Sequence, residues 1–315
     1  MNVWLICEDH KSGTWAQLDA ICSVIKLKYH NATFHKVYLE KKYIYSSLPC
    51  FLQFFPLKIH DFPKNLPDLV IASGRGAVST ATAIKKKGIK TIFVLNPNCS
   101  TDNFNLVLCP KHDNVFGDNV INFHGALNNF TYENIKNEFN EKSYLFNHLP
   151  RPFTSIMLGG DSKHYKFDEF GINETVDSIK NIISSNDFSG SILLSSSRRT
   201  PPLLFKMVSK LISDKPNFIY DGKTSTENPY KAFIYCADKF IVTPDSVSML
   251  CETAFMGKGV FHTDIKFKNK RFNRFINDSY KKKVLFPIEC FFHENLTINK
   301  LDEINCIKYD LLTNI

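Results

Sequence analysis

IVTPDSVSMLCETAFMGKGVF, residues 241–261, is the stretch that decides the fold. IVT at 241–243 predicts a buried strand, and PDS at 244–246 predicts a polar turn before a helix over about 247–256. The glycines of the following GKG end that helix, and VF begins a second strand. A strand that passes through a polar turn into a helix is typical of an open α/β sheet, in which ligands bind beyond the carboxyl ends of the strands. The free N–H groups and the positive dipole end at the start of such a helix suit a phosphate group.

Strands, polar turns and helices alternate along the whole chain in two blocks. LPRP at 149–152 predicts a linker between them, so we expect two domains, 1–148 and 149–315. A last helix predicted over 301–312 could cross back to the first domain. The pattern predicts an α/β fold with two doubly wound, Rossmann-like sheets that face each other across a cleft. The predicted strands are 3–7, 34–39, 68–72, 91–95, 106–109 and 120–123 in the first block, and 154–158, 191–194, 217–220, 241–243 and 260–261 in the second.

The net charge of the chain indicates which kinds of binding partner to consider. The formal net charge is +8, which fits a solvated basic face without a partner, a site for an anionic small ligand, or an anionic membrane surface. Nucleic acid is not expected, because the sequence contains no recognisable nucleic-acid module. The apolar segment 48–59 is predicted either to pack or to form an exposed patch that touches membrane or an acceptor lipid.

Cysteine usage and hydropathy bear on the compartment. The nine cysteines show neither a CxxC motif nor Cys/His zinc spacing, which favours reduced core thiols and predicts no metal site. The first residues lack the features of a signal peptide, and no apolar run approaches the ~18 residues of a transmembrane helix. We therefore expect a cytoplasmic protein, with a peripheral position on the inner face of the plasma membrane as a further candidate.

Polar residues cluster at three strand ends of the second block: GGDS at 159–162, SSSRRT at 195–200 and TPDS at 243–246. The carboxyl ends of neighbouring parallel strands converge on one crevice. There, glycines would admit a ligand, Ser and Thr would donate to phosphate, and Arg198 or Arg199 would neutralise it. The alternative is that all three are ordinary turns and helix caps, but their number in one domain favours an anion or nucleotide site.

The helix after Asp245 places Ser248 and Glu252 on the rim of this crevice. A carboxylate one or two turns into such a helix can accept hydrogen bonds from both ribose hydroxyls, and the alternative for Glu252 is a solvated helix residue. Cys251 is predicted to be a core residue rather than a nucleophile, because no partner base is visible.

The first block offers a weaker set of candidates. A general base needs a carboxylate or an imidazole at a strand end, and Asp9 or His10 meets that requirement. Gly74 and Arg75, in a second strand-to-helix turn, and His112 also lie at predicted strand ends or loops of this block.

Several strings together resemble one known family. The first-block motifs are DHKSGTWAQ at 9–17, SGR at 73–75, PKHD at 110–113 and HGAL at 124–127, and the second-block motifs are GGDS at 159–162, SSRRTP at 196–201 and TPDSVSM at 243–249. They are similar to motifs of the mitochondrial-fission-protein-like family, whose members are grouped with glycosyltransferases and whose bacterial members are linked to lipooligosaccharide outer core. The family's opening turn often has the form Asp-Gly-x-x-Gly. In this chain the first of those glycines is replaced by His10.

This resemblance implies a GT-B-like fold that binds a nucleotide-sugar donor mainly in the second domain and an acceptor mainly in the first, without an essential metal or other cofactor. Gly74, Arg75 and His112 would then lie on the acceptor side. The expected activity is transfer of a sugar to a cell-envelope glycolipid, lipooligosaccharide or oligosaccharide acceptor. A non-catalytic membrane-associated scaffold and a nucleotide-sugar epimerase or hydrolase are the alternatives. The predicted donor-binding residues are Gly159, Gly160, Asp161, Ser197, Arg198, Thr200, Asp245, Ser246, Ser248 and Glu252.

Overall fold

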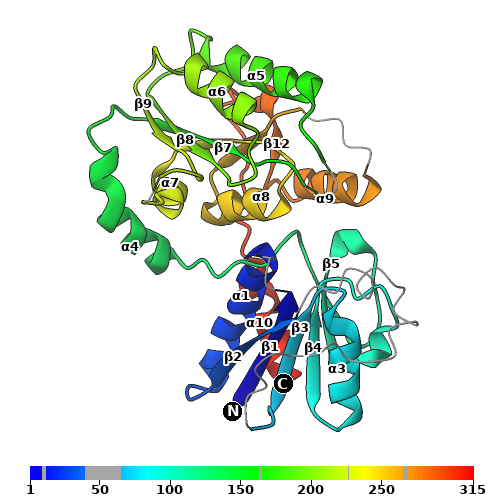
Figure 1. Ribbon diagram of the computed structural model, residues 1–315. Helices are drawn as coiled ribbons and strands as arrows, with labels where there is room; N and C mark the ends of the chain where they lie inside the picture. Colours follow the sequence, from blue (N-terminus) through cyan, green and yellow to red (C-terminus); the bar gives the residue numbers. More distant parts are fainter. Residues whose placement is uncertain (9–11, 40–64, 163–164, 226, 265–268) are drawn as a thin grey trace. The chain divides into compact units, whose positions relative to one another are not determined.

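The computed structural model describes residues 1–8, 12–39, 65–162, 165–225, 227–264 and 269–315 (Figure 1). The chain forms two compact units. The first comprises Met1–Asn129 together with Asp302–Ile315, and the second comprises Phe130–Leu301. The chain therefore passes from one unit to the other between Asn129 and Phe130, earlier than the boundary predicted at 148/149.

The first unit contains a six-stranded parallel sheet with the order β2-β1-β3-β4-β5-β6. β3 and β5 are buried throughout, as expected for a parallel sheet covered on both faces. The strands are β1 (Asn2–Glu8), β2 (Thr33–Leu39), β3 (Leu69–Ser73), β4 (Lys90–Val94), β5 (Leu106–Pro110) and β6 (Val120–Phe123).

Helices cover both faces of the first sheet. Val3, Leu5 and Cys7 belong to the core beneath α1 (Ser12–Lys28), whereas Trp4 and Ile6 belong to the core beneath α3 (Ala77–Lys86). This alternation follows from the period of two along a strand. The C-terminal helix α10 (Glu303–Thr313) joins the α1 core through Ile307 and Leu311, and the Lys28 amine donates to the carbonyls of Leu312 (2.7 Å) and Ile315 (3.0 Å).

The second unit repeats the architecture with the strand order β12-β11-β10-β7-β8-β9, again all parallel. Its short edge strand β12 escaped the sequence analysis because two residues carry no periodic signal. The strands are β7 (Phe153–Leu158), β8 (Ser191–Ser196), β9 (Asn217–Tyr220), β10 (Lys239–Val242), β11 (Gly259–His262) and β12 (Phe286–Pro287).

The helices of the second unit also lie in two layers. In Figure 1, α5 and α6 lie on one face of the sheet, and α7 and α8 lie on the other. The core beneath α5 and α6 contains Ile156, Leu158, Ile192 and Leu194. Residues of α4 pack against α7 through Phe139 and Tyr235, whose ring centroids are 4.9 Å apart, so α4 belongs to this unit. The helices are α4 (Tyr132–Lys142), α5 (Glu169–Ile183), α6 (Pro202–Leu211), α7 (Tyr230–Cys236), α8 (Val247–Thr253) and α9 (Lys270–Lys281).

The described helices and cysteines bear on two of the sequence expectations. No helix in the described ranges has the length and apolar composition needed to cross a membrane. Cys7, Cys22, Cys109, Cys236 and Cys251 are buried, and burial raises the pKa of the Cys22 and Cys236 thiols to about 12. Those two thiols stay protonated at neutral pH, which suits a core role.

Candidate functional site

The sheet order of the second unit brings the three polar strand ends together. β10, β7 and β8 are adjacent, with Val242 opposite Met157 and Leu158 opposite Ser196. The turns that follow these strands are joined by hydrogen bonds. The Gly159 N–H donates to the Thr243 hydroxyl at 2.7 Å, and the Thr200 hydroxyl donates to the Gly159 carbonyl at 2.5 Å.

Asp245 joins the first and third turns. One oxygen of its carboxylate accepts from the Gly160 N–H at 2.7 Å, and the other accepts from the Thr243 hydroxyl at 2.7 Å. Burial raises the pKa of Asp245 to about 6, although these two donors and the charge of Arg199 act in the opposite direction. Both carboxylate oxygens are thus engaged by the protein itself.

The two glycines of the first turn allow parts of the protein to approach each other. A Cβ at Gly159 would lie 2.3 Å from the carboxylate oxygens of Asp245, and one at Gly160 would lie 2.1 Å from the backbone of Arg199. The space that a side chain would occupy is therefore filled by the neighbouring turns. This differs from the expectation that the glycines leave that space to a ligand.

Thr200 and Asp161 also act within the turns. The Thr200 oxygen accepts from the Ser197 N–H at 2.8 Å, and the Asp161 carboxylate accepts from the Phe167 N–H at 2.9 Å. The Arg199 guanidinium donates to the Asp161 carbonyl at 2.8 Å. Two of the predicted donor-binding residues, Thr200 and Asp161, therefore hold the shape of the site.

A pocket of about 260 Å³ opens beside this network, at the carboxyl ends of β8 and β9. Its wall includes the exposed Arg198, the ring of Tyr220 and the thioether of Met249. The volume lies just below the ~300–1,000 Å³ of pockets that hold drug-sized ligands, so it suits a nucleoside-sized group. The lining residues are Ser195, Ser196, Ser197, Arg198, Tyr220, Gly222, Asn228, Tyr230 and Met249.

Tyr230 connects this pocket to Glu252. Its hydroxyl donates to the Glu252 carboxylate at 2.6 Å. Burial raises the pKa of Glu252 to about 7, which outweighs the lowering effect of the Tyr230 hydroxyl and of the Lys231 charge. Burial, and then the charge of Glu252, raises the pKa of Tyr230 well above its ordinary value, so Tyr230 remains a donor. The sequence analysis missed Tyr230, which lies 22 residues from Glu252 in the chain.

The helix predicted over 247–256 is shorter than expected. α8 ends at Thr253, and a 3₁₀ turn over Ala254–Met256 completes the segment. The Ser246 hydroxyl caps α8 by accepting from the Met249 N–H at 3.4 Å, so one of the free N–H groups expected to face a phosphate is already satisfied. Ser248 lies in the first turn of α8 and is partly buried.

In the first unit, Asp9 and His10, the candidate bases, lie outside the described residues, as does the apolar segment 48–59. Gly74 directly follows β3 and has a φ of 90°, a conformation that favours glycine, and the next residue, Arg75, is exposed. The His112 ring lies 3.6 Å from the Asp113 carboxylate. The residues predicted to lie on the acceptor side thus follow β3 and β5, which are separated in the sheet by β4.

The sequence analysis did not select Glu8, a buried carboxylate at the end of β1. Its side chain accepts from the Gly76 N–H at 3.3 Å and so joins β1 to the turn that carries Arg75. The sequence signal that could have indicated Glu8 is its position at the end of the first strand, directly before Asp9.

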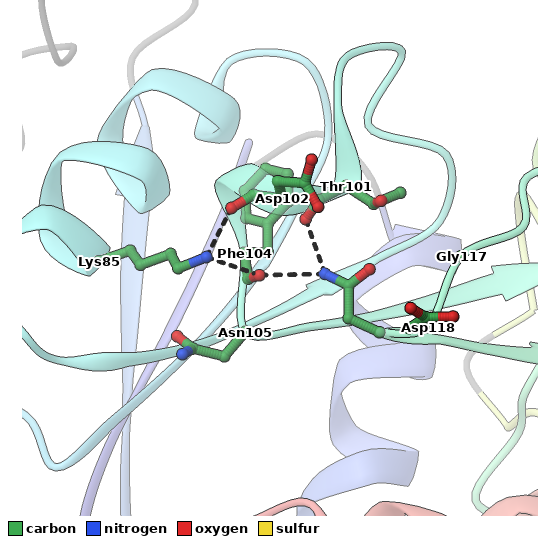
Figure 2. Close-up of a pocket in the computed structure, with 8 residues that line it drawn as sticks. Lys85, Thr101, Asp102, Phe104, Asn105, Gly117 and Asp118 are labelled. Carbon is green, nitrogen blue, oxygen red and sulfur yellow. Dashed lines mark hydrogen bonds between the residues drawn. The ribbon is translucent and has the colours of Figure 1, made fainter.

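A second pocket, of about 580 Å³, lies on the first unit at the amino ends of β5 and β6 (Figure 2). The Lys85 amine donates to the carbonyls of Asp102 at 2.5 Å and Phe104 at 2.9 Å, and the Asn119 amide donates to the Thr101 carbonyl at 2.8 Å. These groups bond to one another, and the pocket lies at the edge of the sheet opposite the carboxyl ends of its strands. We therefore do not include this pocket in the candidate site. Within the described ranges, no three His, Cys, Asp or Glu side chains are grouped so that they could hold a metal ion.

Comparison with known protein families shows which family this chain belongs to. The family model described as "Mitochondrial fission ELM1" matches residues 12–312. The chain belongs to this family. The resemblance inferred from the motifs is therefore confirmed.

This ELM1-family chain is similar in sequence to two relatives. It is 29% identical over 345 residues to an uncharacterized protein of Rickettsia prowazekii, covering 95% of this chain and 92% of the relative. It is 25% identical over 227 residues to the mitochondrial fission protein ELM1 of Arabidopsis thaliana, covering 64% of this chain and 52% of that protein. The match thus spans about half the length of the Arabidopsis protein.

Solved structures show the fold of this ELM1-family member. The UDP-GlcNAc 2-epimerase of Methanocaldococcus jannaschii, in complex with UDP-GlcNAc and UDP, has a TM-score of 0.57 at 14% identity, with 99% of each chain covered. MurG of Acinetobacter baumannii has a TM-score of 0.54 at 10% identity, also with 99% of each chain covered. HepE of Anabaena, in complex with UDP-glucose, has a TM-score of 0.50 at 11% identity, with 100% of each chain covered. The predicted GT-B-like α/β fold is confirmed.

Proposed function

We propose that this protein is a GT-B glycosyltransferase that takes a sugar from a nucleotide-sugar donor and transfers it to a cell-envelope glycolipid, such as a lipooligosaccharide. The observation that carries the proposal is the pocket at the carboxyl edge of the second sheet, with Arg198 in its wall and the Tyr230–Glu252 pair beside it. Neighbours of the same fold have been solved with UDP, UDP-GlcNAc and UDP-glucose, which supports a ligand of this class.

Each part of the pocket suits one part of a nucleotide. Tyr220, Tyr230 and Met249 present apolar surface to a planar base. The Glu252 carboxylate would accept from the ribose hydroxyls, while Tyr230 holds it in place. Arg198 would neutralise the phosphate, and the sugar would extend beyond the pocket.

In the transfer step, a hydroxyl oxygen of the acceptor forms a bond to the anomeric carbon as the bond from that carbon to the phosphate oxygen breaks. In an inverting reaction, a base accepts the proton of the attacking hydroxyl, and Asp9 or His10 remains the proposed base. The charge that develops on the leaving phosphate would be met by Arg198 and backbone N–H groups. The proposed reaction uses no divalent metal and no other cofactor.

An epimerase or a hydrolase is the alternative that the fold itself favours, because a UDP-GlcNAc 2-epimerase is among the structural neighbours. The two functions differ in their use of free donor. An epimerase or hydrolase converts the nucleotide sugar alone, whereas a transferase releases nucleotide efficiently only when an acceptor is present.

The first experiment is a thermal-shift panel of nucleoside diphosphates, nucleoside monophosphates and their sugars on the full chain. A ligand present at ~100 times its Kd stabilises the folded state by about 2.7 kcal/mol, which gives a clear rise in Tm. At the same ligand concentration, the matched variant Glu252→Gln should lose about half of the shift or more, while retaining its unliganded fold.

The second step is to measure nucleotide release from the best ligand with and without an envelope glycolipid extract. Release that depends on the extract supports the transferase. Conversion of free donor at an equal rate supports the epimerase or hydrolase. The absence of a shift with every nucleotide would overturn the proposal and favour a non-catalytic scaffold.

A further inference from the structure

The outer face of α9 carries a line of basic side chains. Lys270, Arg274 and Lys281 are spaced by four and seven residues, which places them on one side of an α-helix over a rise of roughly 17 Å. Lys270 and Lys281 are exposed and Arg274 is partly exposed. Lys282 and Lys283 continue the exposed basic run beyond the end of the helix.

The opposite face fixes this orientation. Phe272, Phe275 and Ile276 are buried in the second unit. The Tyr280 ring stacks on His262, with ring centroids 5.6 Å apart and planes at 12°, and its hydroxyl bonds to the imidazole. The helix is therefore held with its basic side chains directed to solvent, and its aromatic side chains are used inside the protein.

Helix stability explains only the C-terminal end of this charge pattern, because the helix dipole favours a cation in the last turn, where Lys281 lies. Lys270 and Arg271 stand in the first turn, where the helix dipole disfavours cations, and that turn contains no acidic residue. Lys281 lies 3.8 Å from the Asp278 carboxylate, an exposed pair of the kind that contributes little. Lys270, Lys282 and Lys283 form no ion pair with any residue in the described ranges. Lys270 is thus retained without a local gain in helix stability.

We propose that the outer face of α9 docks this protein on an anionic lipid bilayer. The negative potential of an anionic membrane surface attracts Lys and Arg side chains near it, so a row of cations on the outer face of a helix is complementary to such a surface. The surface fits lipid better than single-stranded nucleic acid. Binding of single strands uses exposed aromatic rings for stacking, and all three aromatic residues of α9 are buried or stacked in the protein.

The test is co-sedimentation of the full chain with vesicles of phosphatidylcholine mixed with phosphatidylglycerol, compared with vesicles of pure phosphatidylcholine. We expect binding to the anionic vesicles only, and loss of binding at high NaCl because screening shortens the reach of the charges. The triple variant Lys270→Gln/Lys281→Gln/Lys282→Gln should bind the anionic vesicles at least about tenfold more weakly, since each basic residue contributes to attraction near the surface.

The matched control is Lys86→Gln/Lys87→Gln/Lys90→Gln, which removes three exposed lysines from the first unit and changes the net charge equally, from +8 to +5. It should bind as the unmodified chain does. Equal loss in both variants would show that net charge alone matters, and would overturn the assignment to α9. Failure of the unmodified chain to bind anionic vesicles, or binding of an oligonucleotide in place of vesicles, would overturn the proposal itself. None of these outcomes depends on the nucleotide site.

Discussion

The carboxyl edges of the two sheets differ although both sheets have six parallel strands. In the second unit, Thr243, Asp245 and Thr200 tie three turns into one hydrogen-bonded network beside a pocket. In the first unit, the bond from the Gly76 N–H to Glu8 joins the end of β1 to one turn, and the larger of the two described pockets lies at the amino edge. Among the described residues, two sheets of the same architecture therefore differ in the turns that follow their strands.

The largest expected effect tests the network of the second unit. Gly160→Ala would place a Cβ 2.1 Å from the Arg199 backbone, so the turns must separate. We expect destabilisation by ~3 kcal/mol or more, as for severe overpacking. In Gly13→Ala, the control at the start of α1, nothing lies within 4 Å of the new Cβ, and a gain of up to ~1 kcal/mol is expected. Urea unfolding measures both, and equal effects would contradict the argument.

The next effect concerns Glu252 and pH. Its pKa is raised from an ordinary value near 4.5 to about 7 in the folded state, so its contribution to stability is greatest below pH 4.5 and falls as the pH rises to about 7. Nucleotide binding should change in the opposite direction, because only the carboxylate can accept from both ribose hydroxyls. Calorimetric affinity should therefore increase between about pH 6 and 8.

Glu252→Gln is the matched variant for this titration. It should bind nucleotide roughly 10- to 100-fold more weakly at pH 8, which corresponds to the ~1.5–3 kcal/mol of a charged hydrogen bond, and both pH dependences should flatten. Retention of the affinity increase in this variant would show that another group titrates.

A smaller effect is expected from removing a Tyr–Glu hydrogen bond beside the pocket, compared with removing a Tyr–Glu hydrogen bond on the surface. Tyr230 and Tyr144 each donate to a Glu carboxylate at 2.6 Å, but Tyr144 and its partner Glu227 are exposed. Tyr230→Phe should weaken nucleotide binding about fivefold, or ~1 kcal/mol, because Glu252 loses its positioning donor. Tyr144→Phe should change neither binding nor stability measurably. Similar losses of affinity in both variants would remove the special role of Tyr230.

The smallest effect concerns the pocket of the first unit. Lys85→Met removes the donor to the Asp102 and Phe104 carbonyls, so a loss of ~0.5–1.5 kcal/mol of stability is expected by urea unfolding. Its nucleotide affinity should equal that of the unmodified chain. A loss of affinity would mean that this pocket, and not the one in the second unit, binds the ligand.

Much of the fold could be predicted because it depends on local pattern. Short apolar runs such as ILL at 192–194 and IVT at 241–243 are typical of buried strands when turn residues such as Gly, Pro, Ser and Asp bound them. The motif strings also sufficed to identify the family. The domain boundary was harder to predict, because the sequence of α4 does not indicate which unit the helix packs against. The contact between α4 and α7 assigns it to the second unit.

The candidate site was only partly predictable. The sequence alone determined that polar residues follow the strands and that Asp245 and Glu252 stand near one of them. Tertiary structure decided what those residues do. Asp245 faces the Gly160 N–H, 85 positions away in the chain, while Glu252 faces Tyr230 beside a pocket. The physical reason is that local periodicity sets which way a side chain points from its own element, whereas hydrogen-bond partners and burial, and hence pKa, depend on which strands become neighbours.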